Sequence, residues 1–364
     1  MRGTPDLQTT MLTGLSTESL IPADHPIRRI RQVVEAVLRE LDREFTGMYA
    51  GTGRPSVPPE VLLKSTVLMA MYSIRSERAF CERLNYDLLF KWFLDMKVDA
   101  PAFDATTFTK NRERLLQHEV ADRFFAAVVE QAKLRRYVSS EHFSVDGTLL
   151  EAWASHKSFR PKDDQGGGKP PTGGGRNAEH NFHGERRSNA THQSTTDPEA
   201  RMARKGNAVA AKLSYAGHVL MENRQALIVD MELTPATGYA ERETALTLLD
   251  RLPKMARRRT VAGDKGFDSK DFVAGCRSRG FTPHVAQNTT NRRSAVDGRT
   301  TRHAGHLVSQ RIRKRIEEPF GWIKTVAGGR KLRYLGRRRN RAWFLMVGAV
   351  YNILRIATLD AQPA

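Results

Sequence analysis

Apolar residues recur every three or four positions along residues 27–41, and this spacing predicts an amphipathic helix. The stripe consists of Ile27, Ile30, Val33, Val34, Val37, Leu38 and Leu41. Pro26 stands directly before it, where the first turn of a helix tolerates proline. Residues 49–55 contain two glycines and a proline and are predicted to form a loop. We therefore interpret residues 1–56 as an N-terminal arm followed by one helix.

Residues 57–136 have the pattern of several short helices. Pro58-Pro59-Glu60 is typical of a helix start, because a first turn tolerates proline and favours a carboxylate. Ser76 is predicted to cap the next helix, and Asp104 or Thr106 to cap a later, basic one. Such a series is typical of a helix-turn-helix-like DNA-binding domain; the alternative is a plain helical bundle with a solvated charged face. The candidate DNA contacts here are Lys110 and Arg112.

From residue 137 onward, short strands alternate with helices. Strands are predicted at 143–150, 213–221, 226–233, 260–263 and 282–286, and helices at 239–252, 269–279 and 309–324. The turn at 222–225 makes the first three strands an antiparallel meander. Three strands, a helix, a strand, a helix, a strand and a helix is the order of a ribonuclease-H-like α/β domain. We expect that fold over 137–357, next to the all-helical domain.

A segment of different composition interrupts this domain at about 160–197. It contains two Gly-Gly-Gly runs, a Pro-Pro pair and few large apolar residues. It cannot bury enough surface to offset its ordering entropy, so we expect a mobile loop that orders on DNA. A metal site is one interpretation of its histidines, which are His180, His183 and His192. The flexible spacing and the lack of cysteines disfavour it.

The overall charge indicates a polyanionic partner. The 364 residues include 59 Lys and Arg against 40 Asp and Glu, a formal net charge of +19. A membrane is the weaker alternative, because the apolar run at 342–351 is ten residues long and a spanning helix needs about 20. The N-terminus has no apolar signal sequence, and two cysteines exclude a disulfide scaffold or a four-cysteine zinc site. We expect a cytoplasmic, nucleoid-associated protein.

The positive charge is concentrated near the C-terminus. Residues 291–344 hold sixteen Lys and Arg against three Asp and Glu, a net of +13. Such clustering is typical of phosphate contacts, although a solvated basic tail is the alternative. Aromatic residues in the same stretch favour folded structure, so we predict a basic helical region at about 309–357. The candidate DNA contacts in it are Arg330, Lys331, Arg337, Arg338 and Arg339.

Three acidic residues are candidates for catalysis. Asp146 lies inside the first predicted strand of the α/β domain, where burying a charge is costly unless a cation offsets it. Asp264 ends the fourth strand, and ligand sites in open α/β sheets gather at such strand ends. Glu317 is an acid within a basic helix. Each has a simpler explanation: Asp146-Gly147 as a turn, Asp264 as a helix-leading turn, and Glu317 as a partner of Arg313.

Together the three carboxylates suit divalent metal ions. Mg²⁺ prefers oxygen ligands and keeps several waters, so a few carboxylates suffice. Two such ions can clamp a phosphodiester, one activating the attacking water or 3′-hydroxyl and the other stabilising the leaving oxygen. We therefore predict Mg²⁺ or Mn²⁺ as cofactor, with two ions, held by Asp146, Asp264 and Glu317.

Several blocks of the chain resemble the DDE transposases of bacterial insertion sequences, in the insertion-sequence-four and -five superfamily. The blocks are Phe143–Ser158, Val261–Asp268, and Arg313–Lys324 followed by Gly328–Lys331. The third block resembles the family signature Tyr-x₂-Arg-x₃-Glu-x₆-Lys, with a departure at its tyrosine position, where this chain has Gln310. Residues 55–115 resemble the N-terminal domain common in the group. The resemblance covers about residues 15–357.

The resemblance implies an activity and the roles of several residues. Asp146, Asp264 and Glu317 would ligate the metals, and Lys324 and Arg313 would hold DNA phosphate near the cut. The enzyme would bind the terminal inverted repeats of its own element, cleave the DNA and join 3′-ends to target DNA. A homodimer or higher oligomer would form the synaptic complex. The alternatives are a ribonuclease-H-fold nuclease without strand transfer and a DNA-binding protein without catalysis.

Helix geometry distinguishes Glu317 from its neighbour. At about 100° per residue, Arg313, Glu317 and Lys324 share one face of an α-helix. Glu318 is turned about 100° away and precedes Pro319, which disfavours helical geometry there. We expect Glu317 as the third ligand. A kink at Pro319 would turn Lys324 away from this face, but it would not change the position of Arg313 relative to Glu317.

Overall fold

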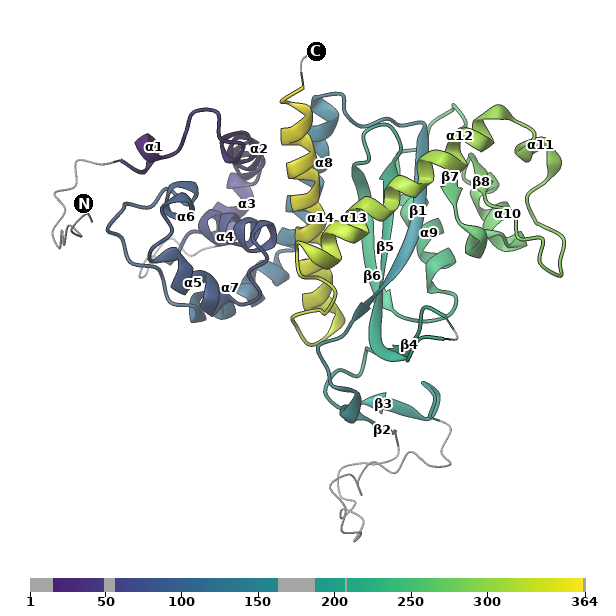
Figure 1. Ribbon diagram of the computed structural model, residues 1–364, viewed down its shortest axis with the longest axis horizontal. Coiled ribbons are helices and arrows are strands. Elements are labelled where there is room, and N and C mark those ends of the chain that lie inside the picture. Colours follow the sequence, from purple (N-terminus) through teal and green to yellow (C-terminus); the bar gives the residue numbers. More distant parts are fainter. Residues whose placement is uncertain (1–15, 49–55, 163–186, 207, 363–364) are drawn as a thin grey trace, which may run out of the picture.

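The computed structural model describes residues 16–48, 56–162, 187–206 and 208–362. Two long helices, α8 (Val120–Leu134) and α14 (Arg337–Leu359), run through the middle of the molecule. The N-terminal helices lie on one side of them and a mixed sheet lies on the other (Figure 1). The predicted arm at 1–15, the predicted loop at 49–55 and the histidines His180 and His183 lie outside the described residues.

The amphipathic stripe near the N-terminus forms a helix as predicted. After the short α1 (Thr17–Leu20), α2 (Ile27–Glu40) begins directly after Pro26, and α3 (Asp42–Gly47) follows. The apolar stripe of α2 is buried, with Val34 and Val37 fully excluded from solvent. The 3.6-residue period therefore identified both the helix and its inward face.

The predicted helical block is also present. It comprises α4 (Pro59–Met71), α5 (Glu77–Leu84), α6 (Leu88–Phe93), α7 (Thr106–Gln117) and α8. The Ser76 hydroxyl caps α5 by accepting a hydrogen bond from the N–H of Ala79 at 3.1 Å, as predicted. Asp104 accepts from the N–H of Thr106 at 2.7 Å at the start of α7.

The sheet contains six strands in mixed orientation. They are β1 (His142–Glu151), β4 (Arg201–Ala203), β5 (Lys212–Glu222), β6 (Ile228–Pro235), β7 (Arg259–Gly263) and β8 (Phe281–Val285). Their order is β4-β5-β1-β7-β8, and β6 also pairs with β5. β1 is antiparallel to β5 and parallel to β7, and β5 is antiparallel to β6. The predicted meander and the α/β class are therefore confirmed.

The two faces of β1 carry different side chains. Phe143 and Val145 are buried in a cluster with Leu248 of α9 (Ala240–Arg251) and Phe272 of α10 (Lys270–Ser278). Because side chains alternate along a strand, Asp146 points to the opposite face. On that face the C-terminal helices α12 (Ala304–Ile312) and α13 (Glu317–Thr325) cross the sheet (Figure 1).

The helix predicted at 309–324 is broken in the middle. α12 ends at Ile312, a 3₁₀ turn, η4, spans Arg313–Ile316, and α13 begins at Glu317. The N–H of Glu317 bonds to the carbonyl of Lys314, three residues back. Pro319 explains the break, because it has no N–H for the carbonyl of Arg315 and its ring crowds that group. A 3₁₀ turn advances about 120° per residue, so the expected shared face of Arg313 and Glu317 was wrong.

Helix α14 is the common core of the molecule. It packs against α2, α4, α8 and β6, and one hydrophobic cluster runs through all of them. At Gly348 it approaches β6 so closely that an added Cβ would lie 2.1 Å from the sulfur of Met231. Asn352 bonds through its side chain to both the N–H and the carbonyl of Ile228, at 2.9 and 2.7 Å. Within the basic region predicted at about 309–357, α14 is basic mainly at its start, and the other basic residues lie before it.

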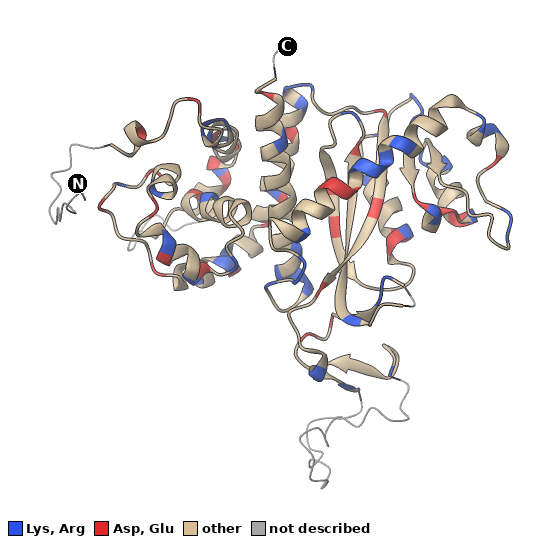
Figure 2. Ribbon diagram, in the orientation of Figure 1, with Lys and Arg blue, Asp and Glu red and all other residues tan. Residues whose placement is uncertain are grey.

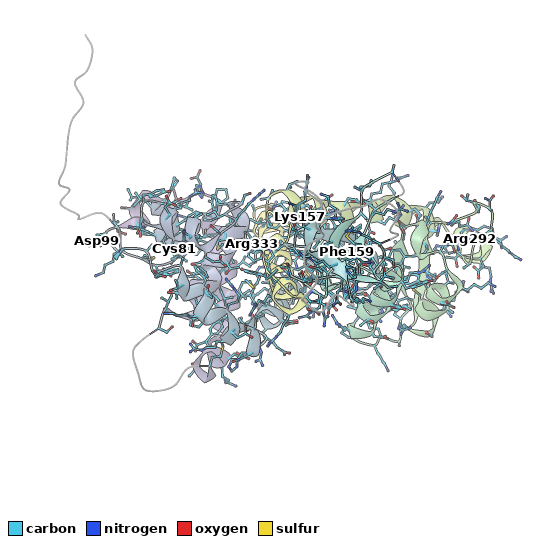
Figure 3. The ribbon with its side chains drawn as sticks, turned by 90° about the horizontal axis from the view of Figure 1, so that it is seen from below. Cys81, Asp99, Lys157, Phe159, Arg292 and Arg333 are labelled. Atoms are coloured by element: carbon cyan, nitrogen blue, oxygen red, sulfur yellow. The ribbon has the colours of Figure 1, made fainter. Side chains whose placement is uncertain are left out.

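The N-terminal helices and the sheet therefore share a core across the predicted boundary at 136/137. Arg333 links them: it donates to the carbonyl of Ile74 at 2.6 Å and lies 3.8 Å from the ring centroid of Trp343 (Figure 3). Among the described residues α14 alone is long and apolar enough to cross a membrane, and 78% of its most apolar window is buried inside the protein. The domain boundaries at 56/57 and 136/137 remain predictions.

Part of the segment predicted to be a mobile loop is ordered. β2 (Phe159–Pro161) and β3 (His192–Ser194) form a two-stranded sheet below the main one (Figure 1). Phe159 stacks on His192 with ring centroids 5.4 Å apart, and both are buried. His192 therefore serves as a packing residue. Residues 163–186 lie outside the described residues.

Candidate active site

The middle of β1 presents Asp146, which is half-buried on the face crossed by α13. Its Oδ1 accepts a hydrogen bond from the N–H of Gly147 at 2.8 Å. The strand pairs in register with β5, Asp146 lying opposite Val219. Because β1 is paired with β5 on one side and β7 on the other, the sheet fixes the position of this carboxylate.

Asp264 follows the last residue of β7, as predicted. β1 and β7 are paired in parallel with Ser144 beside Ala262. Continued by two residues, that register sets Asp264 level with Asp146. Asp264 Oδ1 accepts from the N–H of Gly266 at 2.7 Å, which fixes the carboxylate at the head of a short 3₁₀ turn.

The two neighbouring glutamates at the start of α13 face different surroundings. The charge of Glu317 acts on Asp146 and on Lys324. Glu318 instead has its Oε1 3.9 Å from Nε of Arg315, and its charge acts on Tyr351. Figure 2 shows this acidic segment flanked by basic residues of η4 and α13 where it passes over the sheet.

The carboxylates repel one another strongly. Burial, the largest cause, together with the negative charges of Glu241, Asp264 and Glu317, raises the pKa of Asp146 to about 7, although the hydrogen bond from Gly147 opposes the shift. Among the described residues, no ion pair neutralises Asp146 or Asp264. The cluster therefore concentrates negative charge that no direct ion pair to Asp146 or Asp264 offsets.

Basic side chains lie beside this cluster. Lys324 Nζ donates to Thr148 Oγ1 at 2.5 Å. Burial, chiefly, and the positive charges of Lys205 and Arg330 hold the pKa of Lys324 below its usual value, while Glu317 and Asp146 oppose the shift. Sequence reasoning did not identify Lys205, since an exposed lysine after a short strand carries no distinguishing signal.

The segment after α13 is pinned to the end of β1. The N–H of Glu151 donates to the carbonyl of Arg330 at 3.0 Å, and the N–H of Leu332 donates to the carbonyl of Glu151 at 2.8 Å. This pairing places the exposed side chains of Arg330 and Lys331 at the end of the strand that carries Asp146. The charge of Arg330 acts on Lys324 from there, and Lys331 lies beside Glu151.

Gln310, at the signature's tyrosine position, bridges a strand and Arg313. Its Nε2 donates to the carbonyl of His284 in β8 at 2.5 Å, and its Oε1 accepts from Nε of Arg313 at 2.9 Å. The amide therefore ties Arg313 to the sheet. A glutamine can do this because it carries both a donor and an acceptor.

The remaining predicted DNA contacts lie away from the carboxylates. Lys110 is exposed, whereas Arg112 pairs with Glu77 at 2.6 Å and lies over the ring of Tyr334. Arg338 and Arg339 are each 3.4 Å from Glu113, and Arg337 is 3.5 Å from Glu199. These arginines are largely exposed but engaged in surface ion pairs.

A fourth carboxylate, Glu241, lies in the cluster. It is in the first turn of α9, and its charge raises the pKa of Asp146. Burial and the charge of Asp264 raise its own pKa. Sequence reasoning missed Glu241, because an acid in the first turn of a helix is already explained by the helix dipole.

The donor set fits a hard divalent cation. Four carboxylates offer only oxygen ligands, which Mg²⁺ and Mn²⁺ prefer. As the side chains stand, no three His, Cys, Asp or Glu residues within the described ranges converge closely enough to hold a metal ion. A separate cavity of about 770 Å³, lined by His142, Arg258 and Arg299 among others, has none of the four carboxylates in its wall.

An α/β protein with carboxylates and a lysine gathered at the middle of its sheet belongs to a class that acts on phosphate esters. Family comparison specifies which one. Residues 140–353 match the family described as "Transposase DDE domain", and residues 15–114 match "Transposase domain (DUF772)". The chain belongs to the DDE transposase family, and its function is DNA transposition with divalent metal ions.

Solved structures similar to this chain include transposases bound to DNA. The piggyBac transposase synaptic complex with hairpin DNA is 8% identical, with 92% of this chain and 76% of that chain covered and a TM-score of 0.42. The Mos1 transposase paired-end complex with left transposon end is 12% identical, with 72% and 73% covered and a TM-score of 0.20. Scores this low carry no argument about the present fold.

Proposed function

We propose that this transposase binds the terminal inverted repeats of its insertion sequence, cleaves the DNA there and joins the freed 3′-ends to target DNA. The observation that carries the proposal is that Asp146, Asp264 and Glu317, from three distant parts of the chain, lie near enough for the charges of Asp264 and Glu317 to raise the pKa of Asp146. The strand order and the parallel pairing of β1 with β7 support a ribonuclease-H-like catalytic fold.

Asp146, Asp264 and Glu317 hold the metal in this proposal. When bound, two Mg²⁺ or Mn²⁺ ions activate the attacking hydroxyl or water and stabilise the leaving oxygen. The three carboxylates come from β1, the end of β7 and the start of α13, so the sheet and the crossing helix set their spacing. Glu318 takes no part, because its charge faces Arg315 and Tyr351.

The basic residues beside the cluster hold the DNA backbone. Lys324, fixed by Thr148, lies within electrostatic reach of both Glu317 and Asp146, so it is placed to bind the phosphate that is cut. Arg330 and Lys331, at the end of β1, extend the positive surface away from the cut. Arg313, held by Gln310, is the further phosphate contact that we assign to this region.

Surface arginines contribute contacts that do not depend on DNA sequence. The exposed side chains of Arg337, Arg338 and Arg339 form weak surface pairs with Glu199 and Glu113, which a phosphate can replace. Lys110 and Arg112 are assigned to the DNA surface of the N-terminal helices. Binding two transposon ends requires at least a homodimer, and the DNA substrate places the enzyme at the nucleoid in the cytoplasm.

An assay that separates binding, cutting and joining tests the proposal. Wild-type protein with Mg²⁺ should cut a DNA fragment bearing the element's ends and join them to a target plasmid. Asp264→Asn should bind the same fragment and neither cut nor join. Cutting without joining would identify a nuclease instead, and unchanged cutting by Asp264→Asn would remove that residue from the site.

A further inference from the structure

Glu241 reaches the carboxylate cluster from the opposite face of the sheet. Helix α9 packs with Phe143 and Val145 on the face away from α13. Glu241, in the first turn of that helix, approaches β1 at Gly147, the residue after Asp146. The metal site is thus bordered by α13 on one side of the sheet and by α9 on the other.

The glycine at position 147 makes this approach possible. A Cβ added to Gly147 would lie 2.7 Å from Oε1 of Glu241, closer than real side chains come. The N–H of Gly147, which bonds to Asp146 Oδ1, also opposes the rise in the pKa of Glu241. The Glu241 carboxylate thus occupies the space that a side chain at position 147 would fill, so a larger residue there would displace it.

The second oxygen of Glu241 is directed to the other aspartate. A Cβ added to Gly266 would lie 3.7 Å from Oε2 of Glu241 and 3.0 Å from Oδ1 of Asp264. Gly266 is the residue whose N–H holds Asp264. The Glu241 carboxylate therefore lies between the strand that carries Asp146 and the turn that carries Asp264.

Within the described residues, Glu241 takes part in no ion pair. The charge of its neighbour Arg242 favours the ionised form of Glu241, but burial and the charge of Asp264 outweigh it and raise the pKa of Glu241. A partly buried carboxylate beside two aspartates is costly unless a cation offsets the charge. A bound cation would therefore stabilise the ionised carboxylate of Glu241 in this position.

We propose that Glu241 is a fourth carboxylate ligand of the divalent metal, an inference that rests on the proposed site of Asp146, Asp264 and Glu317. Mg²⁺ and Mn²⁺ take six oxygen ligands and usually keep several waters. Glu241 would supply one carboxylate oxygen to the metal from the α9 side of the sheet, beside those of Asp146, Asp264 and Glu317.

Binding of Mn²⁺ to the full-length protein tests this directly, without reference to activity. Glu241→Gln keeps the shape of the side chain but removes the charge. Its affinity for Mn²⁺, measured by electron paramagnetic resonance titration, should fall at least about tenfold. The matched control is Glu243→Gln, the same change two residues along the same helix, where the side chain is exposed; its Mn²⁺ affinity should equal that of the wild type.

Asp264→Asn distinguishes the failure of this inference from the failure of the proposed function. If Asp264→Asn loses Mn²⁺ binding and Glu241→Gln keeps it, Glu241 is no ligand and the three-carboxylate site stands. If both variants bind Mn²⁺ as the wild type does, the proposed metal site itself is wrong. Should Glu241→Gln not fold, Glu241→Asp decides: it keeps the charge but withdraws it by one methylene, and unchanged Mn²⁺ affinity would overturn the inference.

Discussion

Lys324 and Thr148 are joined by a hydrogen bond although 176 residues separate them in the chain. Thr148 is two residues after Asp146 on β1, and Lys324 is seven residues after Glu317 along α13. The bond therefore fixes where α13 crosses β1, close to the positions of Glu317 on the helix and Asp146 on the strand. It also holds a lysine whose charge is partly desolvated, which strengthens its attraction to phosphate.

Thr148→Val should weaken catalysis by releasing Lys324. Valine keeps the shape and removes the acceptor, and a hydrogen bond to a charged group is worth about 1.5–3 kcal/mol. We expect cleavage of a transposon-end fragment to slow by roughly tenfold or more, with little change in DNA affinity. Thr148→Ser, which restores a hydroxyl, is the control and should recover most of the rate. A Thr148→Val rate equal to that of the wild type would mean that the bond does not position Lys324.

Glu317→Gln and Glu318→Gln form a matched pair on adjacent positions. Glu317→Gln removes a metal ligand at nearly constant shape and should lower cleavage by at least about 10³-fold, because a metal contributes several kcal/mol to such a reaction. Glu318→Gln breaks only a 3.9 Å surface contact with Arg315 and should keep most of the activity. Both should bind DNA. The reverse ranking of the two variants would shift the assigned ligand by one residue.

The metal-free protein should become less stable as pH rises from about 4 to about 7. Burial and neighbouring carboxylates raise the pKa of Asp146 to about 7 in the folded state, against about 3.9 in an unfolded chain. The folded state then binds more protons than the unfolded state in this interval. The stabilisation from protonated Asp146 is therefore complete below the unfolded pKa and is lost as the pH rises through the folded pKa. We expect a fall of roughly 1–2 kcal/mol after allowance for solvent screening.

Urea unfolding with a chelator at several pH values measures that slope. Asp146→Asn carries no titrating group at this position and should lose most of the slope. Excess Mn²⁺ should also remove it from the wild type, because metal binding keeps the carboxylates ionised. An identical slope in wild type and Asp146→Asn would assign the effect to other groups.

Gln310→Ala should loosen Arg313 and destabilise the sheet edge. The carbonyl of His284 loses a donor and Arg313 loses its acceptor. Each such hydrogen bond contributes about 1 kcal/mol, so we expect the Tm to fall by a few degrees and cleavage to slow several-fold. Gln310→Glu keeps the acceptor for Arg313 and should preserve cleavage better than it preserves the Tm. Equal losses in the two variants would argue against a role through Arg313.

DNA binding should depend steeply on salt, and the exposed arginines at the start of α14 should contribute to the slope. Each phosphate contact adds about 0.9 to the slope of log K against log salt. Replacing Arg338 and Arg339 by Gln should lower the slope by up to about 1.8 and weaken binding to any sequence equally. Arg341→Gln is the control: its side chain bonds to Asp122 and Glu232 inside the fold, so it should lower the Tm and leave the slope unchanged.

Much of the fold follows from local sequence patterns. The stripe of α2, the cap at Ser76 and the alternation along β1 each depend on neighbours within one element, so the sequence predicts them well. The same holds for Asp264 at a strand end. What could not be predicted depends on contacts between distant segments: the break before Glu317, the burial of α14, and the arrival of Glu241 from the other face of the sheet. Pro319 marked the break, but Glu241 had no local signal.

The position of α14 has a consequence for how the protein is made. It follows in the chain every element against which it packs, and it supplies the shared core of the N-terminal helices and the sheet. While residues 337–359 are still inside the ribosome, neither half can cover its apolar surface, although synthesis has already delivered all four carboxylates. We therefore expect the catalytic site to become stable only after this helix emerges, and a truncation before residue 337 to expose the apolar surfaces of both parts to aggregation and proteolysis.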